Sequence, residues 1–106
     1  MNVPNTIAEY FLAANTDDAD RVAACFAENA VVRDEGGEIH GKSAVRRWAE
    51  NTRRKYRYRV EVVKAEQEAD RIIVTAHLSG DFPGSPIDLR YRFKLAGATI
   101  IALEIG

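Results

Sequence analysis

The spacing of apolar residues changes once along this chain, near Tyr56, and that change limits the folds available to it. Before this point, apolar residues recur every three or four positions, which predicts amphipathic helices. After it, as in "YRYRVEVVKAE", apolar and charged residues alternate, which predicts strands with one buried face. Helical segments followed by a run of antiparallel strands predict an α+β fold, in which the helices pack against one sheet.

Three helical segments are expected before the change. The first covers residues 4–15, where Thr6 and Glu9 have the spacing of a capping box. The second covers residues 16–29, with acidic residues in its first turn and Asn29 at its end. Few residues separate these two segments, so they should pack as a helical hairpin. The third is expected at residues 43–55.

Six strands are expected. A short strand from Val31 to Glu35 should turn at Gly36–Gly37 into a second short strand ending at His40. In residues 56–66, Tyr58, Val60 and Val62 should share one face. Residues 70–80 are apolar on both faces, which predicts a central strand, and residues 87–97 and 99–106 should form the closing hairpin. With no repeat or linker, residues 1–106 are expected to form one domain.

Composition excludes several classes of protein. The net charge of −1 does not favour a chain built to bind polyanions. The single cysteine, Cys25, cannot form an internal disulfide and is expected to be a buried helix residue. Together with His40 and His77, it lacks the spacing of a metal site. Neither a signal peptide nor a membrane span is expected, so the sequence predicts a soluble cytoplasmic protein that does not bind membranes.

The run "RRWAENTRRKYRYR", residues 46–59, carries seven positive charges and one negative charge. Trp48 and Tyr58 occupy apolar positions of their elements, so they are not free platforms for stacking nucleic-acid bases. Acidic residues follow at positions 61, 66, 68 and 70. A face of ion pairs is therefore expected in place of a nucleic-acid site. Steering of an anionic ligand by this run stays open as an alternative.

Asp34 is the first candidate functional residue. In the short strand it shares a face with Val32, because alternate residues point the same way, so a carboxylate lies on the side that holds a core valine. One interpretation is a pocket-facing carboxylate whose pKa burial raises. The other is an aspartate that accepts backbone N–H groups near Gly36 or pairs with an arginine. The residues alone favour the second interpretation.

The order of several motifs resembles a known family. They are Tyr10 in the first helix, "CFAENAVVRDEGG", "IHGKSAVRRW" and "YRFKLAGATIIALEI". Together they resemble the nuclear transport factor 2-like superfamily, in particular its SnoaL-like and ketosteroid isomerase-like branch. The resemblance implies a cystatin-like conical barrel, in which three N-terminal helices pack on a strongly curved, mainly antiparallel sheet over an apolar cavity. It also implies a homodimer formed through the sheet.

The resemblance also suggests roles for residues. Asp34 lies where ketosteroid isomerases have their base, Tyr10 where they have a phenol that polarises the substrate oxygen, and Trp48 where an aromatic residue lines the pocket. Leu89 occupies the place of their second acid, and the neighbouring Asp88 should face the opposite side of its strand. A full ketosteroid isomerase is therefore not expected. Epoxide hydrolysis on this fold needs Asp and Arg side chains that face the cavity. In "DLRYR", Asp88 and Arg90 should face away from it, unless a β-bulge reverses the alternation.

Three functional hypotheses follow. The first is a cofactor-independent isomerase, lyase or cyclase acting on a small hydrophobic carbonyl compound, with Asp34 as base and Tyr10 polarising the oxygen. The second is a non-catalytic small-molecule-binding protein in which Asp34 serves recognition, and the third is a homodimeric interaction domain. His77 is expected on the outer face of the sheet and His40 at the surface. The expected cavity wall consists of Trp48, Tyr58, Leu89, Tyr91 and Phe93.

Overall fold

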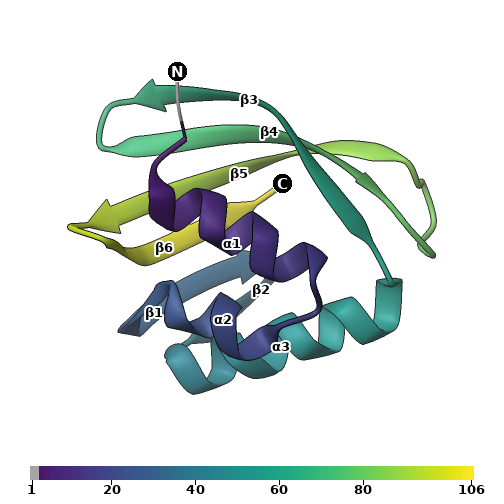
Figure 1. Cartoon of the computed structure of the whole chain (residues 1–106), viewed down its shortest axis with the longest axis horizontal. Coiled ribbons are helices and arrows are strands. Elements are labelled where there is room, and N and C mark those ends of the chain that lie inside the picture. Colours follow the sequence, from purple (N-terminus) through teal and green to yellow (C-terminus); the bar gives the residue numbers. More distant parts are fainter. Residues whose placement is uncertain (1–2) are drawn as a thin grey trace.

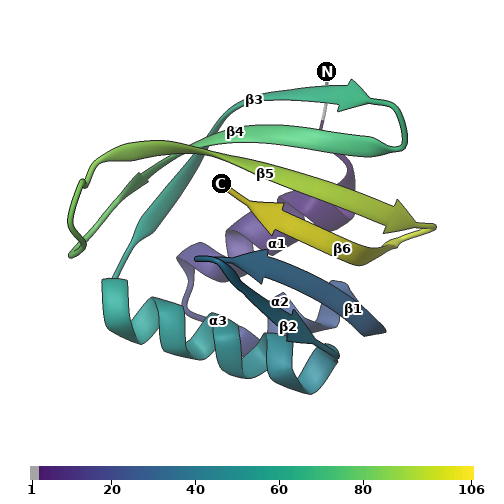
Figure 2. The ribbon, with the colours of Figure 1, turned by 180° about the vertical axis from the view of Figure 1, so that it is seen from behind.

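The computed structural model describes residues 3–106, in which a six-stranded curved sheet wraps around three helices (Figure 1). The strands follow the order β2-β1-β6-β5-β4-β3. The view from behind shows the same sheet with the helices beneath it (Figure 2). The elements in chain order are α1 (Asn5–Asn15), α2 (Ala19–Ala24), β1 (Phe26–Asp34), β2 (Gly37–His40), α3 (Lys42–Tyr56), β3 (Arg59–Glu68), β4 (Arg71–Ser79), β5 (Ile87–Ala96) and β6 (Thr99–Ile105).

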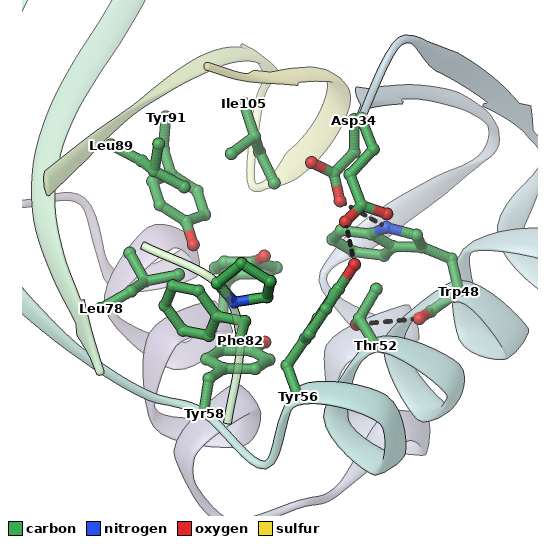
Figure 3. Close-up of a pocket in the computed structure, with 13 residues that line it drawn as sticks. Asp34, Trp48, Thr52, Tyr56, Tyr58, Leu78, Phe82, Leu89, Tyr91 and Ile105 are labelled. Carbon is green, nitrogen blue, oxygen red and sulfur yellow. Dashed lines mark hydrogen bonds between the residues drawn. The ribbon is translucent and has the colours of Figure 1, made fainter. Parts of the chain in front are cut away.

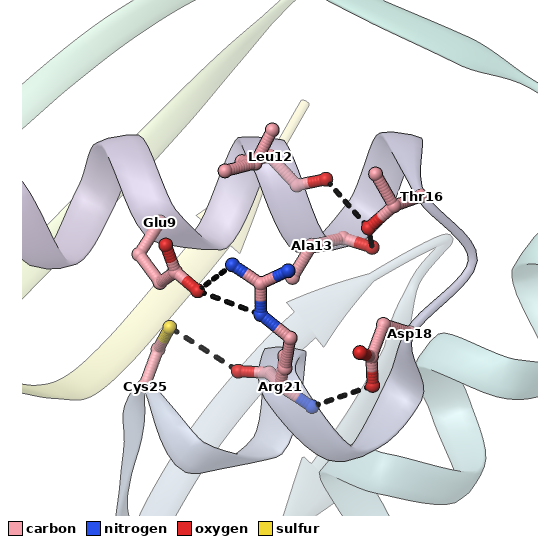
Figure 4. A network of polar contacts seen from close by, with 7 residues as sticks. All are labelled: Glu9, Leu12, Ala13, Thr16, Asp18, Arg21 and Cys25. Atoms are coloured by element: carbon pink, nitrogen blue, oxygen red, sulfur yellow. Dashed lines mark hydrogen bonds and ion pairs between the residues drawn. The ribbon is translucent and has the colours of Figure 1, made fainter.

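The contacts of α1 differ from the predicted capping box. Thr6 Oγ1 donates to the carbonyl oxygen of Ala98 at 2.8 Å, and Glu9 accepts from Arg21 Nε at 2.9 Å. No side chain caps the N-terminus of α1, so the capping-box prediction is wrong: Thr6 and Glu9 have partners elsewhere in the fold. The Glu9–Arg21 pair joins α1 to α2, while Asp18 accepts the backbone N–H of Arg21 at 3.1 Å (Figure 4).

The second helix is shorter than predicted. It ends at Ala24, and residues 26–29 are the start of β1. Phe26 has helical spacing from Val22, which favoured a longer helix, but it pairs in parallel with Ile100 of β6. The N–H of Ile100 also donates to the carbonyl oxygen of Cys25 at 2.9 Å. Pairing with a distant strand therefore overrides the local period. Cys25 is buried, as expected, although it follows α2 directly.

The order of elements also corrects one feature of the expected architecture. The β1–β2 hairpin lies between α2 and α3, so the three helices do not all precede the sheet. α3 agrees closely with its prediction and ends at Tyr56; the next residue, Arg57, has a left-handed conformation with φ of 48°. Arg53 near this end donates to the carbonyl oxygens of Ala14, at 3.1 Å, and of Tyr58. These bonds connect α3 to α1 and to the start of β3.

The central position of β4 and the parity of β5 are confirmed, while only part of the predicted apolar face of β3 is buried. β4 pairs with strands on both sides, as expected for a central strand. On β5, Tyr91 and Phe93 are buried whereas Asp88 is exposed. On β3, Val60 is buried, whereas Val62, paired with Ala76, is 37% exposed; β3 is an edge strand, and its register with β4 shifts after Val62. Such a bulge changes the face that the following residues present.

Aromatic rings form the centre of the core. Tyr10 and Phe11 of α1 pack against Tyr91 and Phe93 of β5 with ring centroids 5.1–6.2 Å apart, mostly edge to face. Phe26 joins them from β1, with its ring centroid 6.0 Å from that of Tyr10. These contacts fix the first helix against the concave side of the sheet. None of the helices within residues 3–106 has the length and apolarity to cross a membrane.

Candidate functional site

A cavity of about 360 Å³ opens between α3 and the concave face of the sheet (Figure 3). Its volume lies within the range of small-molecule pockets in proteins. Residues from four strands (β1, β4, β5 and β6) and two helices line it, together with the β1–β2 turn, the α3–β3 connection and the β4–β5 loop. Six of the seven candidate residues from the sequence lie in this wall: Tyr10, Asp34, Trp48, Tyr58, Leu89 and Tyr91.

Asp34 is the last residue of β1 and faces the cavity. Its Oδ2 accepts a hydrogen bond from Trp48 Nε1 at 3.0 Å, which joins the end of β1 to the middle of α3. Arg33, the nearest arginine in sequence, pairs instead with Glu38 at 2.9 Å. Asp34 faces the cavity, in agreement with the first interpretation, and it also accepts a hydrogen bond from the backbone of Glu35 beside Gly36, which is part of the second.

The surroundings of Asp34 raise its pKa above that of an ordinary aspartate. Burial in the cavity wall raises the pKa of this carboxyl group, and the negative charge of Glu35 raises it further. The hydrogen bond from Trp48 stabilises the carboxylate and lowers the pKa, but less than burial raises it. The carboxyl group is therefore a stronger base than an ordinary aspartate.

Three phenols line the same cavity as Asp34. They are Tyr10 from α1, Tyr58 just before β3 and Tyr91 from β5. Burial raises the pKa of Tyr58 to about 12, and it also raises the pKa of Tyr10 and Tyr91. All three therefore stay protonated at neutral pH and can donate hydrogen bonds. The Tyr91 hydroxyl points into the cavity (Figure 3).

One predicted wall residue does not reach the cavity. Phe93 has the same parity as Leu89 and Tyr91, but it is 0% exposed and lies among the core aromatic rings. The cavity occupies only one end of the sheet, and Phe93 lies farther along β5 from that end. The prediction that Phe93 lines the cavity is therefore wrong, and Phe93 belongs to the hydrophobic core. Leu89 lines the cavity, while Asp88 bonds to His77 on the exposed side at 2.7 Å.

Sequence reasoning missed about half of the wall. Glu35 follows Asp34 and should face away by parity, but its φ of 52° in the turn redirects it to the cavity. Tyr56 donates a hydrogen bond to Glu35 Oε1, and the Phe82 ring packs edge-on against Tyr56 at 5.9 Å. The sequence did offer one signal for Phe82, because an aromatic residue stands there among turn formers, in "GDFPGSP". The other missed wall residues are Thr52, Leu78, Pro83 and Ile105.

Three of the seven basic residues in the run 46–59 take part in ion pairs. Arg46 pairs with Asp20 at 2.5 Å and with Glu50 at 3.4 Å, and Arg54 pairs with Glu50 at 3.3 Å. Arg57 lies 4.0 Å from Asp81. Trp48 and Tyr58 line the cavity, so they do not form an aromatic surface for bases. Within residues 3–106, no three His, Cys, Asp or Glu side chains gather as ligands for a metal ion.

The shift of the Asp34 pKa can be measured directly. We expect the carboxyl carbon of Asp34 to titrate in NMR spectra with a midpoint above its ordinary value of 3.8, because burial disfavours the carboxylate. Asp70 is the internal control, since its bond to Lys94 lowers its pKa. Trp48→Phe, which removes the donor to Oδ2, should raise the Asp34 midpoint further. An Asp34 midpoint at or below that of Asp70 would contradict the buried site.

The curved sheet, the helices inside it and the cavity at its open end define a nuclear transport factor 2-like protein. The family model of the SnoaL-like domain matches residues 7–104, so the chain belongs to this family.

Solved structures agree with this assignment. A protein from Sinorhizobium meliloti, provisionally assigned as a polyketide cyclase, is 36% identical over 98% of this chain and 95% of its own, with a TM-score of 0.94. A ketosteroid isomerase-like protein from Catenulispora acidiphila, in complex with trimethylamine, is 17% identical over 99% and 86%, with a TM-score of 0.87. An epoxide hydrolase/cyclase-like enzyme of pyran ring formation in the polyether salinomycin is 22% identical over 94% and 85%, with a TM-score of 0.79. The last two show the fold alone. No curated protein matches the chain significantly.

Proposed function

We propose that this protein catalyses cofactor-independent proton transfer on a small hydrophobic carbonyl compound, as isomerases, lyases or cyclases do. The observation that carries the proposal is the environment of Asp34, a carboxyl group with a raised pKa in the wall of a largely apolar cavity. Neutral phenols line the same cavity. A base and hydrogen-bond donors around one apolar space suit the removal of a proton next to a carbonyl group.

In the proposed reaction, Asp34 takes a proton from the carbon next to the carbonyl group. The electron pair of that C–H bond forms a C=C bond, and the π pair of the C=O bond moves to the carbonyl oxygen. Negative charge develops there, and Tyr10 donates a hydrogen bond to it. Asp34 then returns the proton, to another carbon in an isomerisation or to the leaving or newly bonded group in an elimination or ring closure. Trp48 holds one carboxylate oxygen at 3.0 Å and so keeps the base in a fixed orientation.

One relative supports this type of reaction. The Sinorhizobium meliloti protein, which is 36% identical, is provisionally assigned as a polyketide cyclase. Ring closure by an enolate begins with the proton transfer that Asp34 is proposed to perform. The homodimer through the sheet and the cytoplasmic location stay predictions.

Deuterium exchange tests the proposal without a known substrate. The protein is incubated in D2O with a panel of small cyclic ketones, and NMR follows the loss of protons next to the carbonyl group. We expect exchange faster than in the presence of an equal concentration of heat-unfolded protein. The proposal would be overturned if every ketone that binds exchanged no faster with the folded protein than with the heat-unfolded control.

A non-catalytic binding protein is the second candidate, and Leu89 favours it. This residue puts an apolar side chain in the cavity where, by the family resemblance, the isomerases have an acid. Loss of one donor to the developing negative charge typically costs about 3–4 kcal/mol of transition-state stabilisation. Ketones that shift cavity resonances but show no added exchange would support this candidate.

A further inference from the structure

We propose that the compound bound in this cavity carries a positive charge, as a protonated or quaternary amine on a small apolar body. The inference rests on the proposed function, because it specifies the substrate class of the same site. Its first support is the charge of the wall. Among residues 3–106, the charged side chains that line the cavity are Asp34 and Glu35, and no Lys, Arg or His lines it.

The second support is the aromatic character of the wall. Six aromatic residues line the cavity: Tyr10, Trp48, Tyr56, Tyr58, Phe82 and Tyr91. The faces of such rings carry partial negative charge and attract cations, most strongly where water is excluded. Alkylated ammonium groups suit a wall of rings and carboxylates, because their methyl groups can contact the rings while the carboxylates balance their positive charge.

In the part of the chain that the structure describes, no basic side chain enters the cavity to balance the negative charge of its wall, although two lie nearby. Arg53 Cζ lies 5.6 Å from the Tyr58 ring, but its guanidinium bonds to the carbonyl oxygens of Ala14 and Tyr58. Lys55 Nζ lies 5.0 Å from the Tyr56 ring, and Tyr56 and the charge of Glu35 raise its pKa, but Lys55 is exposed and outside the cavity lining. The wall therefore repels an anionic ligand, which argues against the alternative that the basic run steers an anion into the cavity.

The geometry also indicates which end holds the charge. An ammonium group beside Asp34 would stabilise its carboxylate and weaken it as a base. Glu35, in contrast, lies at the exposed side of the cavity, bonded to the hydroxyl of Tyr56, against which Phe82 packs. We therefore place the amine near Glu35, Tyr56 and Phe82, and the carbonyl group deeper, near Asp34 and Tyr10.

Three probes of similar size test the charge preference. They are phenyltrimethylammonium, its neutral isostere tert-butylbenzene, and the anion benzoate. Trp48 is the only tryptophan in the chain and its N–H bonds to Asp34, so its single indole signal in NMR spectra reports on the cavity. We expect the cation to bind at least about tenfold more tightly than the neutral isostere, and benzoate to bind weakest.

Glu35→Gln should weaken binding of the cation about threefold, as loss of one partly exposed charge does, and leave the neutral isostere unaffected. Glu61→Gln is the matched control: it removes the same charge from an exposed position of β3 outside the cavity lining, and it should change neither affinity. The inference is overturned if the neutral isostere or benzoate binds as tightly as the cation, if Glu61→Gln acts like Glu35→Gln, or if no probe shifts the indole signal.

The two proposals can fail separately. Exchange on neutral ketones without a preference for the cationic probe would remove this inference and leave the proton-transfer function standing. A preference for the cation without any exchange would support a charged ligand and remove catalysis.

Discussion

Asp34→Asn is expected to lower the rate of deuterium exchange by about 10²–10⁴-fold, the usual contribution of a general base. Asparagine has nearly the same shape and can still accept the hydrogen bond from Trp48, but it cannot take a proton from carbon. The rate is measured by NMR on any ketone that the parent protein exchanges. An Asp34→Asn rate within a few-fold of the parent rate would exclude Asp34 as the base.

Two measurements separate lost catalysis from lost structure. Because burial raises the folded-state pKa of Asp34, folding disfavours its carboxylate, so the asparagine variant should unfold at a higher temperature than the parent at pH 7. That difference should shrink as the pH falls through the raised pKa and disappear below 3.8, where Asp34 is protonated in both states. Asp70→Asn, which removes an exposed carboxylate paired with Lys94 at 3.2 Å, should leave exchange unchanged.

Phe93→Ala is expected to lower the free energy of unfolding by about 3–5 kcal/mol. Phe93 is 0% exposed, and its ring lies 5.5 Å from that of Tyr10 and 5.9 Å from that of Phe11. Removing it leaves a void that these rings fill only in part, since they are held by the helix on one side and the sheet on the other. Urea denaturation followed by circular dichroism measures the change.

Leu12→Ala provides the matched comparison. Leu12 lies in α1 beside Phe11, but 52% of it is exposed, so its truncation should cost no more than about 0.5 kcal/mol. A similar cost for the two variants would mean that the core does not centre on the aromatic rings. A cost of Phe93→Ala below about 1 kcal/mol would place Phe93 outside a close-packed core.

The spacing of apolar residues predicted correctly those helices and strands whose tertiary contacts favour the same secondary structure as their local sequence. α3 and the four strands of the second half lie close to their predicted bounds. Tyr91 is buried and Asp88 exposed, because β5 alternates without interruption over that stretch. The same rule placed Asp34 on the side of Val32, and the structure has it in the wall of the cavity. Resemblance to a family added the cavity, which no pattern of residues specifies by itself.

Features that depend on distant partners could not be read from the sequence. Residues 26–29 have helical spacing, but they are the start of β1, and Phe26 pairs in parallel with Ile100 of β6. Phe93 and Tyr91 have the same parity, but how far a cavity extends along a strand depends on the helices that close it. Glu35 reaches the cavity through a left-handed turn residue, where alternation no longer applies. Each of these depends on tertiary contacts and backbone geometry that periodicity does not encode.

The position of β6 has a consequence for biosynthesis. This strand comes last among the elements but lies between β1 and β5, so it joins the two halves of the sheet. A nascent chain emerging from the ribosome therefore exposes the inner edges of β1 and β5 until residues 99–105 have left the exit tunnel. Unpaired edges of this kind invite aggregation, so the emerging polypeptide should depend on chaperones until its final strand inserts.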